Sequence, residues 1–232
     1  MPKHGKKYIE ANKRLVAGQM LAAAQALAKI KELAYAGFDE SVDVAVNLGI
    51  DPSKGEQVVR GSVTLPYTKG AAPRIVVFAK NEYADEAKKA GADFIGVEDL
   101  IEKISAGWMD FDFAVATPDL MGLVGKVAKI LGPRGLLPNK KLGTVTFDVA
   151  AVVQDLKKGR AFFKNDKQGI VHFSLGKVSF DGDKLQENYA AFMKALLSAK
   201  PTTSKGKFIK KVTVASTMGP GIQVNPDENV RA

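Results

Sequence analysis

The strands predicted towards the two ends of the chain have one apolar face each, whereas those predicted in the middle are apolar on both faces. Residues 41–50 alternate, with Val42, Val44, Val46 and Leu48 on one face and small or polar side chains on the other. One-sided alternation returns in residues 58–65 and 170–175. Such a period of two predicts an antiparallel sheet that is wet on one side.

The middle of the chain follows a different pattern. Residues 74–79 and 113–116 are continuous apolar runs, and segments of helical periodicity separate the predicted strands. Apolar strands alternating with helices predict a doubly wound, mostly parallel sheet. We therefore predict two domains, one α+β and one α/β. A split α+β domain with an antiparallel sheet comprises residues 1–67 plus 160–232, and an inserted, Rossmann-like α/β domain comprises residues 68–159. The crossings near 67 and 159 would form a hinge.

The net charge of the chain favours a polyanionic partner. It is +9 at neutral pH, and the predicted split domain carries 21 Lys and Arg against 13 Asp and Glu. Such an excess suits nucleic acid or an anionic membrane surface. No apolar run approaches the roughly 18 residues of a membrane span. The alanine-rich stretch 15–28 is interrupted by Gly18, Gln19 and Gln25, which favours a surface helix over a targeting peptide.

Motifs for catalysis or cofactor binding do not emerge from the sequence. The absence of cysteine excludes disulfides, thiolate catalysis and zinc fingers, and two histidines are too few for a His-rich metal site. Gly122 and Gly125 precede Lys126 inside a helical pattern and fit no phosphate-binding fingerprint. Asp110 and Asp112 fit a solvated loop better than an acid pair. We therefore predict no enzymatic activity, no cofactor and no metal.

Several segments combine the groups that RNA recognition needs. Residues 159–177 predict a hairpin that is apolar behind and basic or polar in front, with residues 165–169 as its turn. Residues 130–141 form a glycine- and proline-rich loop, which serves equally well as a rigid connector or as a ligand contact. Residues 216–221 end the last predicted strand with hydroxyls, a methionine and glycines. Phosphates attract Arg and Lys, sugar hydroxyls pair with Ser and Thr, and exposed bases stack on apolar side chains, so this set suits RNA.

Motifs spread over nearly the whole chain resemble the family of bacterial large-subunit ribosomal protein one. They are Phe38–Val44, Leu48–Pro52, Val59–Val63, Gly107–Asp112, Ala116–Asp119, Gly132–Asn139 and Thr217–Pro220. The resemblance implies a cytoplasmic ribosomal protein, monomeric when free, whose split domain grips a stalk helix of the large ribosomal RNA. It also implies help in moving and releasing deacylated tRNA from the exit site, and repression of its own messenger RNA. It implies no membrane partner.

The same resemblance identifies the candidate RNA contacts. They are Phe38, Ser41, Arg60, Lys164, Lys167, His172, Thr217, Met218 and Gly219. The chain departs from the family pattern at Gly37, where relatives often carry a basic residue, and after Pro52, where Lys54 is the only basic residue of the turn. These two positions are expected to contribute less here.

Two other hypotheses remain open at this stage. One is a doubly wound enzyme with a basic accessory domain, and the other is a non-specific binder of nucleic acid or membrane surfaces. A specific RNA binder keeps most of its affinity against excess bulk RNA while still weakening with salt, which distinguishes it from a non-specific one.

Overall fold

The computed structural model describes residues 5–16, 18–68, 73–80, 82–204 and 206–226, and the chain divides into two compact units. The first unit comprises residues 1–69 together with 162–232, and the second comprises residues 70–161. The lysines near the N-terminus predict a basic arm over residues 1–7, and the sequence predicts a linker over residues 69–73. Residues 1–4 and 69–72 lie outside the described residues.

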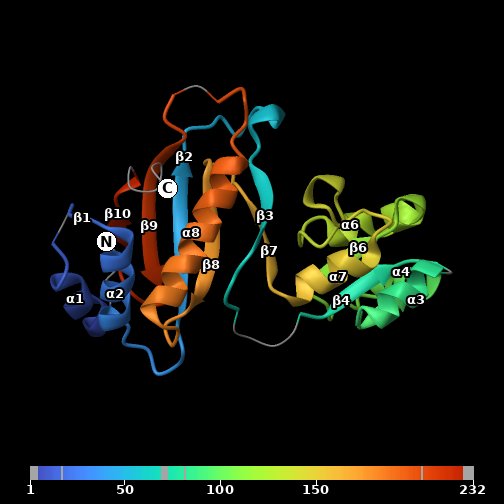
Figure 1. Ribbon diagram of the computed structural model, residues 1–232, viewed down its shortest axis with the longest axis horizontal. Coiled ribbons are helices and arrows are strands. Elements are labelled where there is room, and N and C mark those ends of the chain that lie inside the picture. The colour runs from blue at the N-terminus through green and yellow to red at the C-terminus, as the bar shows by residue number, and fades with distance from the viewer. Residues whose placement is uncertain (1–4, 17, 69–72, 81, 205, 227–232) are drawn as a thin grey trace. The chain divides into compact units, whose positions relative to one another are not determined.

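A five-stranded sheet organises the first unit, in the order β1-β10-β9-β2-β8 (Figure 1). The central strand β2 is antiparallel to both β8 and β9, and β9 is antiparallel to β10. At the edge, β1 runs parallel to β10. The strands are β1 (Met20–Leu21), β2 (Ser41–Leu48), β8 (Ile170–Lys177), β9 (Ile209–Ser216) and β10 (Ile222–Val224). Residues 20–48 supply β1 and β2, and residues 170–224 supply the other three strands.

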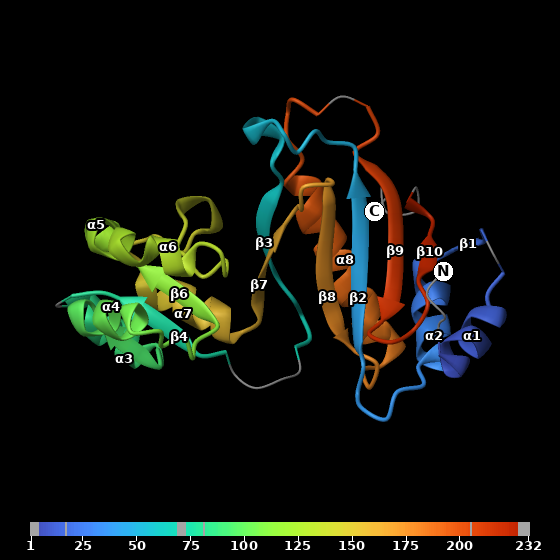
Figure 2. The ribbon, with the colours of Figure 1, turned by 180° about the vertical axis from the view of Figure 1, so that it is seen from behind.

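The two faces of this sheet differ as the alternation predicts. Val42, Val44, Val46 and Leu48 of β2 are buried, while the side chains between them are partly or fully exposed. The helices α2 (Ala23–Leu33) and α8 (Gly182–Ser198) pack against the buried face (Figure 1). Figure 2 shows the opposite face of the sheet, which no helix covers among the residues that the structure describes in the first unit, and we call it the open face. A third helix of the unit, α1 (Lys6–Lys13), precedes β1.

The predicted hairpin over 159–177 is wrong in its pairing. Its first strand, β7 (Arg160–Lys164), pairs with β3 (Arg60–Thr64) in a separate two-stranded sheet, whereas β8 pairs with β2. Only one isolated bridge, from Asn165 to Val171, joins the two arms within the described residues. Packing explains the divergence, because the ring of Phe163 on β7 lies edge-on to Phe192 of α8, with centroids 5.7 Å apart.

The second unit contains a three-stranded parallel sheet in the order β5-β4-β6. All four residues of the central strand β4 are buried, as the continuous apolar run predicts. The elements are β4 (Ile75–Phe78), α3 (Glu82–Lys89), β5 (Phe94–Gly96), α4 (Glu98–Ser105), β6 (Phe113–Ala116), η4 (Lys140–Leu142) and α7 (Val149–Lys157). A mixed α/β fold is confirmed. The doubly wound character of an inserted domain stays a prediction.

The helical pattern around Gly122 and Gly125 predicts a single long helix over about residues 120–131, and this prediction is wrong. The segment is a series of short helical pieces, η2 (Pro118–Leu120), α5 (Met121–Val124), η3 (Gly125–Val127) and α6 (Ala128–Leu131). Gly122 and Gly125 lie within this series, and glycine costs about 1 kcal/mol relative to alanine in a helix interior. These pieces nevertheless place apolar side chains in the core, including Val124, Val127 and Leu131.

Two features of the second unit have structural explanations. In the loop over 130–141, Leu136 and Leu137 pack against the hydrophobic core while Arg134 is exposed. The carboxylates of Asp110 and Asp112 lie 3.9 and 3.7 Å from the guanidinium of Arg74. Because Asp112 also accepts a hydrogen bond from the backbone N–H of Arg74, this acid pair fixes the start of β4.

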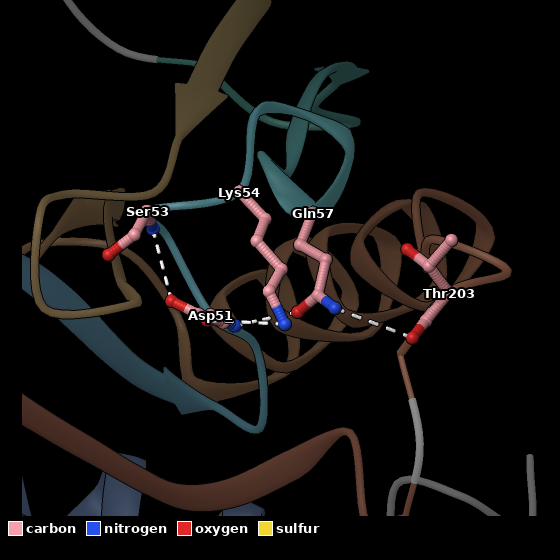
Figure 3. Close-up of polar contacts among 5 residues, drawn as sticks. All are labelled: Asp51, Ser53, Lys54, Gln57 and Thr203. Atoms are coloured by element: carbon pink, nitrogen blue, oxygen red, sulfur yellow. Dashed lines mark hydrogen bonds and ion pairs between the residues drawn. The ribbon is translucent and has the colours of Figure 1, made fainter.

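The turn after β2 is closed by its own side chains (Figure 3). Asp51 accepts a hydrogen bond from the backbone N–H of Ser53, and its carboxylate lies 3.6 Å from the ammonium of Lys54. The side chain of Gln57, in the short helix η1 (Gly55–Gln57), accepts from the N–H of Asp51 and donates to the carbonyl of Thr203. The only basic side chain of the turn is therefore already paired within it.

Candidate nucleic-acid interface

One end of the five-stranded sheet brings together residues from three distant segments. Ser41 begins β2, Lys177 ends β8 directly opposite it, and Thr217 follows the last residue of β9. The ammonium of Lys177 donates to the hydroxyl of Ser41 at 2.8 Å. The backbone N–H of Ser41 donates to the hydroxyl of Thr217 at 2.9 Å, and the N–H of Thr217 donates to the carbonyl of Ser41 at 3.0 Å. Two hydroxyls and a cation are thus held side by side.

Two exposed apolar side chains stand beside these polar groups. Phe38 is 57% exposed and Met218 is 50% exposed. Both belong to loops that adjoin the strand end. We call Phe38, Ser41, Lys177, Thr217 and Met218 the strand-end cluster. It combines a positive charge, hydroxyls and apolar surface, the three kinds of group that contact phosphate, ribose and unstacked bases.

A buried carboxylate holds the two loops in place. Glu40 is only 2% exposed, and its Oε1 accepts hydrogen bonds from the backbone N–H groups of Tyr35 and Ala36 at 3.1 and 2.9 Å. Its Oε2 accepts from the N–H of Met218 at 3.0 Å. Burial alone would raise the pKa of Glu40, but these backbone bonds and one from the hydroxyl of Ser216 lower it below its ordinary value. Glu40 is therefore a charged clamp between sequence-distant loops.

The Met218 loop has further constraints. The phenol of Tyr35 donates to the carbonyl of Met218 at 2.6 Å. The N–H of Gly219 donates to the carbonyl of Ser216 at 3.1 Å, and a Cβ at Gly219 would lie only 2.4 Å from the hydroxyl oxygen of Ser216. A side chain at position 219 would therefore displace the hydroxyl of Ser216. The side chain of Met218 is exposed, but the backbone that carries it is fixed.

The remaining candidate contacts lie away from the strand-end cluster. His172 on β8 is opposite Ala45 of β2, and the turn that carries Lys167 lies beyond the pair formed by Asn47 and Ile170. Six residues separate Ser41 from Asn47, a span of about 20 Å along the strand. The structure therefore divides the candidates into two groups on the same unit, with Phe38, Ser41, Thr217, Met218 and Gly219 in one and Arg60, Lys164, Lys167 and His172 in the other.

The second group is ordered by Asn165. This residue is 6% exposed, and its side-chain oxygen accepts from the N–H of Val59 at 2.8 Å while its own N–H donates to the carbonyl of Val59 at 3.0 Å. Arg60 follows Val59 and Lys164 precedes Asn165, so the two basic residues are neighbours on the paired strands β3 and β7. We call Arg60, Lys164, Lys167 and His172 the basic group.

Asp166 shapes the turn within the basic group. Its Oδ1 accepts from the backbone N–H groups of Ile170 and Gln168, both at 2.8 Å, and its Oδ2 lies 3.7 Å from Nε2 of His172. The bond from Ile170 is the main cause of a lowered pKa of Asp166, with smaller contributions from Gln168 and His172. The imidazole remains largely exposed beside it, at 66% of its side-chain surface.

A shallow hollow on the open face lies beside His172. It has a volume of about 450 Å³ and is lined by Asp43, Val44, Ala45, His172, Phe173, Ser174, Thr213 and Ala215. Small side chains from β2 and β9 form much of its floor. A ligand that follows the sheet from the strand-end cluster towards the basic group would therefore meet little steric obstruction within this unit.

Sequence reasoning missed the groups that position the contacts. Glu40, Tyr35 and Asn165 look like ordinary polar residues beside predicted strands, and their partners are distant in sequence. Lys177 is visible as a basic residue of the 159–177 segment, but nothing in the pattern places its ammonium on Ser41. Within the described ranges, no cluster of three His, Asp or Glu side chains could hold a metal ion. In the same ranges, every helix is too short or too polar to span a membrane.

Comparison with known protein families supplies the broader assignment. The model of the ribosomal protein L1p/L10e family matches residues 30–220, which include both groups of candidate contacts. The chain therefore belongs to the ribosomal protein L1p/L10e family, a structural, non-enzymatic family of the large ribosomal subunit that binds ribosomal RNA.

Proposed function

We propose that the first unit binds a stalk helix of the large ribosomal RNA through the strand-end cluster and the basic group. The observation that carries this proposal is the Glu40 clamp, which fixes Phe38 and Met218 in exposed positions beside the hydroxyls of Ser41 and Thr217. Because half or more of each side chain is exposed, Phe38 and Met218 contribute less to the core of the unit than buried side chains of the same size would. A preorganised surface also loses less entropy on binding than a flexible one.

The two groups have different roles in this proposal. The strand-end cluster offers hydroxyls and apolar surface, which suit ribose and unpaired bases, so it supplies specificity. The basic group offers Arg60, Lys164 and Lys167, which suit phosphates and supply affinity that falls with salt. Substitutions in the first group should therefore reduce discrimination between RNAs, and those in the second should reduce the salt dependence.

The test is RNA binding by Thr217→Val and Met218→Asp, measured against a stalk-helix RNA with excess bulk RNA present. Thr217→Val removes a ribose contact and also the hydroxyl that accepts from the N–H of Ser41, so it should weaken binding at least five- to tenfold. A carboxylate at position 218, covered by the bound RNA, should weaken it more. Thr202→Val and Met20→Asp are matched controls, because both residues are exposed and lie outside the two groups. Wild-type affinity in both Thr217→Val and Met218→Asp would remove the strand-end cluster from the site.

Two finer roles, which the resemblance to the family implies, belong to the proposal. We infer that the protein assists the movement and release of deacylated tRNA from the exit site, and that it represses translation of its own messenger RNA. If a messenger segment imitates the ribosomal site, it should compete with the stalk helix for the strand-end cluster. Thr217→Val should then weaken both RNAs in parallel, and unequal losses would argue against a shared site.

The domain division is also a proposal. We propose that residues 1–67 and 160–232 form the RNA-binding domain and that residues 68–159 form an inserted domain joined to it by two connections. Such connections would permit relative motion. Distance measurements between labels on the two domains, with and without RNA, test the hinge, and a single fixed distance in both states would contradict it.

A further inference from the structure

The parallel sheet of the second unit has a topological switch point. The chain passes from the central strand β4 to β5 on one side and then crosses to β6 on the other. The carboxyl ends of β4 and β6 therefore diverge into connections on opposite sides of the sheet. Open α/β sheets bind ligands in the crevice outside such a point. Here the backbone N–H of Thr117, just after β6, donates to the carbonyl of Phe78 at the end of β4, at 3.1 Å.

A cavity lies at this switch point. Its volume is about 380 Å³, which falls in the usual range for small-molecule sites. It is lined by Lys80, Glu82, Tyr83, Thr117, Asp119 and Leu120. The inner surface is formed by Thr117 and Leu120, which are buried, and by Tyr83, which is half-buried. The charged residues Lys80, Glu82 and Asp119 are exposed at the rim. We call this cavity the crevice.

The buried hydroxyl in the crevice is available to a ligand. Thr117 is 2% exposed, yet none of the described residues forms a hydrogen bond with its side-chain oxygen. Every fully buried side-chain polar atom of the described residues has a hydrogen-bond partner, so the oxygen of Thr117 is not fully buried. The hydroxyl therefore reaches the crevice, where it can donate one hydrogen bond and accept others.

The other lining groups define the chemistry of the ligand. Lys80 lies two residues after the end of β4, and α3 begins at Glu82 with backbone N–H groups that have no partner inside the helix, so this rim favours a phosphate. Tyr83 offers an aromatic surface, extended by the ring of Phe147 with its centroid 5.9 Å away. The carboxylate of Asp119 can accept hydrogen bonds from a ribose diol. The carboxylate of Glu82 carries the same sign of charge as a phosphate, so it should weaken phosphate binding at this rim.

We propose that the crevice binds one ribonucleotide, with its base against Tyr83, its ribose between Thr117 and Asp119, and its phosphate at Lys80. All these residues belong to the second unit, so the inference does not depend on the proposed RNA surface of the first unit. The same chemistry is presented by a free 5′-nucleotide and by an unpaired nucleotide of an RNA strand. The experiment distinguishes these two sources.

The test is a calorimetric or NMR titration of the full chain with the four ribonucleoside 5′-monophosphates, the four nucleosides and single-stranded tetraribonucleotides. Lys80→Ala should weaken the nucleotides several-fold and leave the nucleosides unchanged, while Glu82→Gln should strengthen the nucleotides. Thr117→Val should weaken both roughly five- to tenfold, the effect of one lost hydrogen bond. Lys88→Ala, an exposed lysine on the same helix, is the matched control and should change nothing. Tighter binding of a tetranucleotide than of any monophosphate identifies an RNA strand as the source, and the reverse identifies the free nucleotide.

Two results would overturn the proposal. One is the absence of binding by every probe at millimolar concentration, and the other is unchanged binding in both Lys80→Ala and Thr117→Val. Because Lys80 is exposed, its variant remains informative even if the buried Thr117→Val misfolds. The affinity of the same variants for the stalk-helix RNA should equal that of the wild type. Failure of the nucleotide proposal would therefore leave the proposed RNA surface of the first unit standing, and failure of the RNA surface would leave the nucleotide proposal standing.

Discussion

Replacing Glu40 by glutamine removes one carboxylate oxygen from a buried clamp while preserving its shape. The native side chain accepts from the N–H groups of Tyr35 and Ala36 through one oxygen and from that of Met218 through the other. An amide group can accept through only one of these positions. If the amide oxygen faces Tyr35 and Ala36, its NH₂ group faces the N–H of Met218 and leaves that donor unsatisfied.

The expected cost follows from this count. An unsatisfied buried donor costs about 1–3 kcal/mol, and two charge-assisted hydrogen bonds become neutral, which adds about 1 kcal/mol. We therefore expect Glu40→Gln to lower the free energy of unfolding of the first unit by about 2–4 kcal/mol at neutral pH. The structural change should centre on the Met218 loop, which Glu40 holds, so RNA affinity should fall as well.

The pH dependence gives this prediction a second signature. The pKa of Glu40 is lowered by folding, so its carboxylate stabilises the folded state fully above its unfolded pKa of about 4.3. That contribution is lost as the pH falls through the folded-state pKa. The difference in stability between wild type and Glu40→Gln should therefore be largest at neutral pH and shrink below about pH 4.

Hydrogen exchange measured by mass spectrometry is the suitable assay. Peptides that contain the N–H groups of Tyr35, Ala36 and Met218 should lose protection, whereas the fluorescence transition of Trp108, which belongs to the second unit, should not move. Glu32→Gln is the matched control, because Glu32 is exposed on α2. Unchanged exchange at Met218, or equal urea midpoints at pH 7, would refute the clamp.

Three further predictions concern other parts of the first unit. Asn188→Leu should lower the free energy of unfolding of this unit by about 3–4 kcal/mol, because its fully buried amide makes three hydrogen bonds, two of them with the backbone of Tyr67. Urea unfolding followed by circular dichroism measures this loss. Asp166→Asn should loosen the turn beside His172. Because folding lowers the pKa of Asp166, the effect should be present at neutral pH and fade as the pH falls below about 3.9. Amide hydrogen exchange of the turn measures this effect. A shortened chain that joins 1–67 to 160–232 through a short linker should fold and bind the stalk helix, as gel-shift titration would show.

Controls separate these effects from general damage. Asn12→Leu and Asp183→Asn change exposed residues of α1 and α8 and should leave stability unchanged. Wild-type stability of Asn188→Leu would mean that the amide contributes little to the packing of α8. If the shortened chain folds but does not bind, the inserted segment supplies essential contacts, and if it does not fold, the proposed division of the chain is wrong.

The alternation of β2 could be predicted because a period of two is a local property of the chain. Burial of Val42, Val44 and Val46 confirms it. Strand partners are not local, and so the pairing of β7 with β3 was missed. The turn over 165–169 does reverse the chain, but the packing of Phe163 on α8 directs β7 away from β8.

The candidate site was less accessible from the sequence than the fold. Exposed Phe38 and Met218 become meaningful only when the strand end brings their loops together, and resemblance, not periodicity, singled them out. Glu40 follows another acid and looks like a solvated residue. Its burial depends on a loop about 180 residues away, at a separation that no short pattern can encode.

The strand order of the five-stranded sheet also determines when its strands can pair during translation. Both ladder partners of β2, β8 and β9, are translated long after it, since about 120 residues separate Leu48 from Ile170. At roughly 5–20 residues per second, β2 waits on the order of 10 s without a neighbouring strand. The strand-end cluster is incomplete until Met218 has left the ribosome that makes it. A nascent chain therefore cannot present the complete strand-end cluster, and with it the proposed RNA surface, before the Met218 loop has been made.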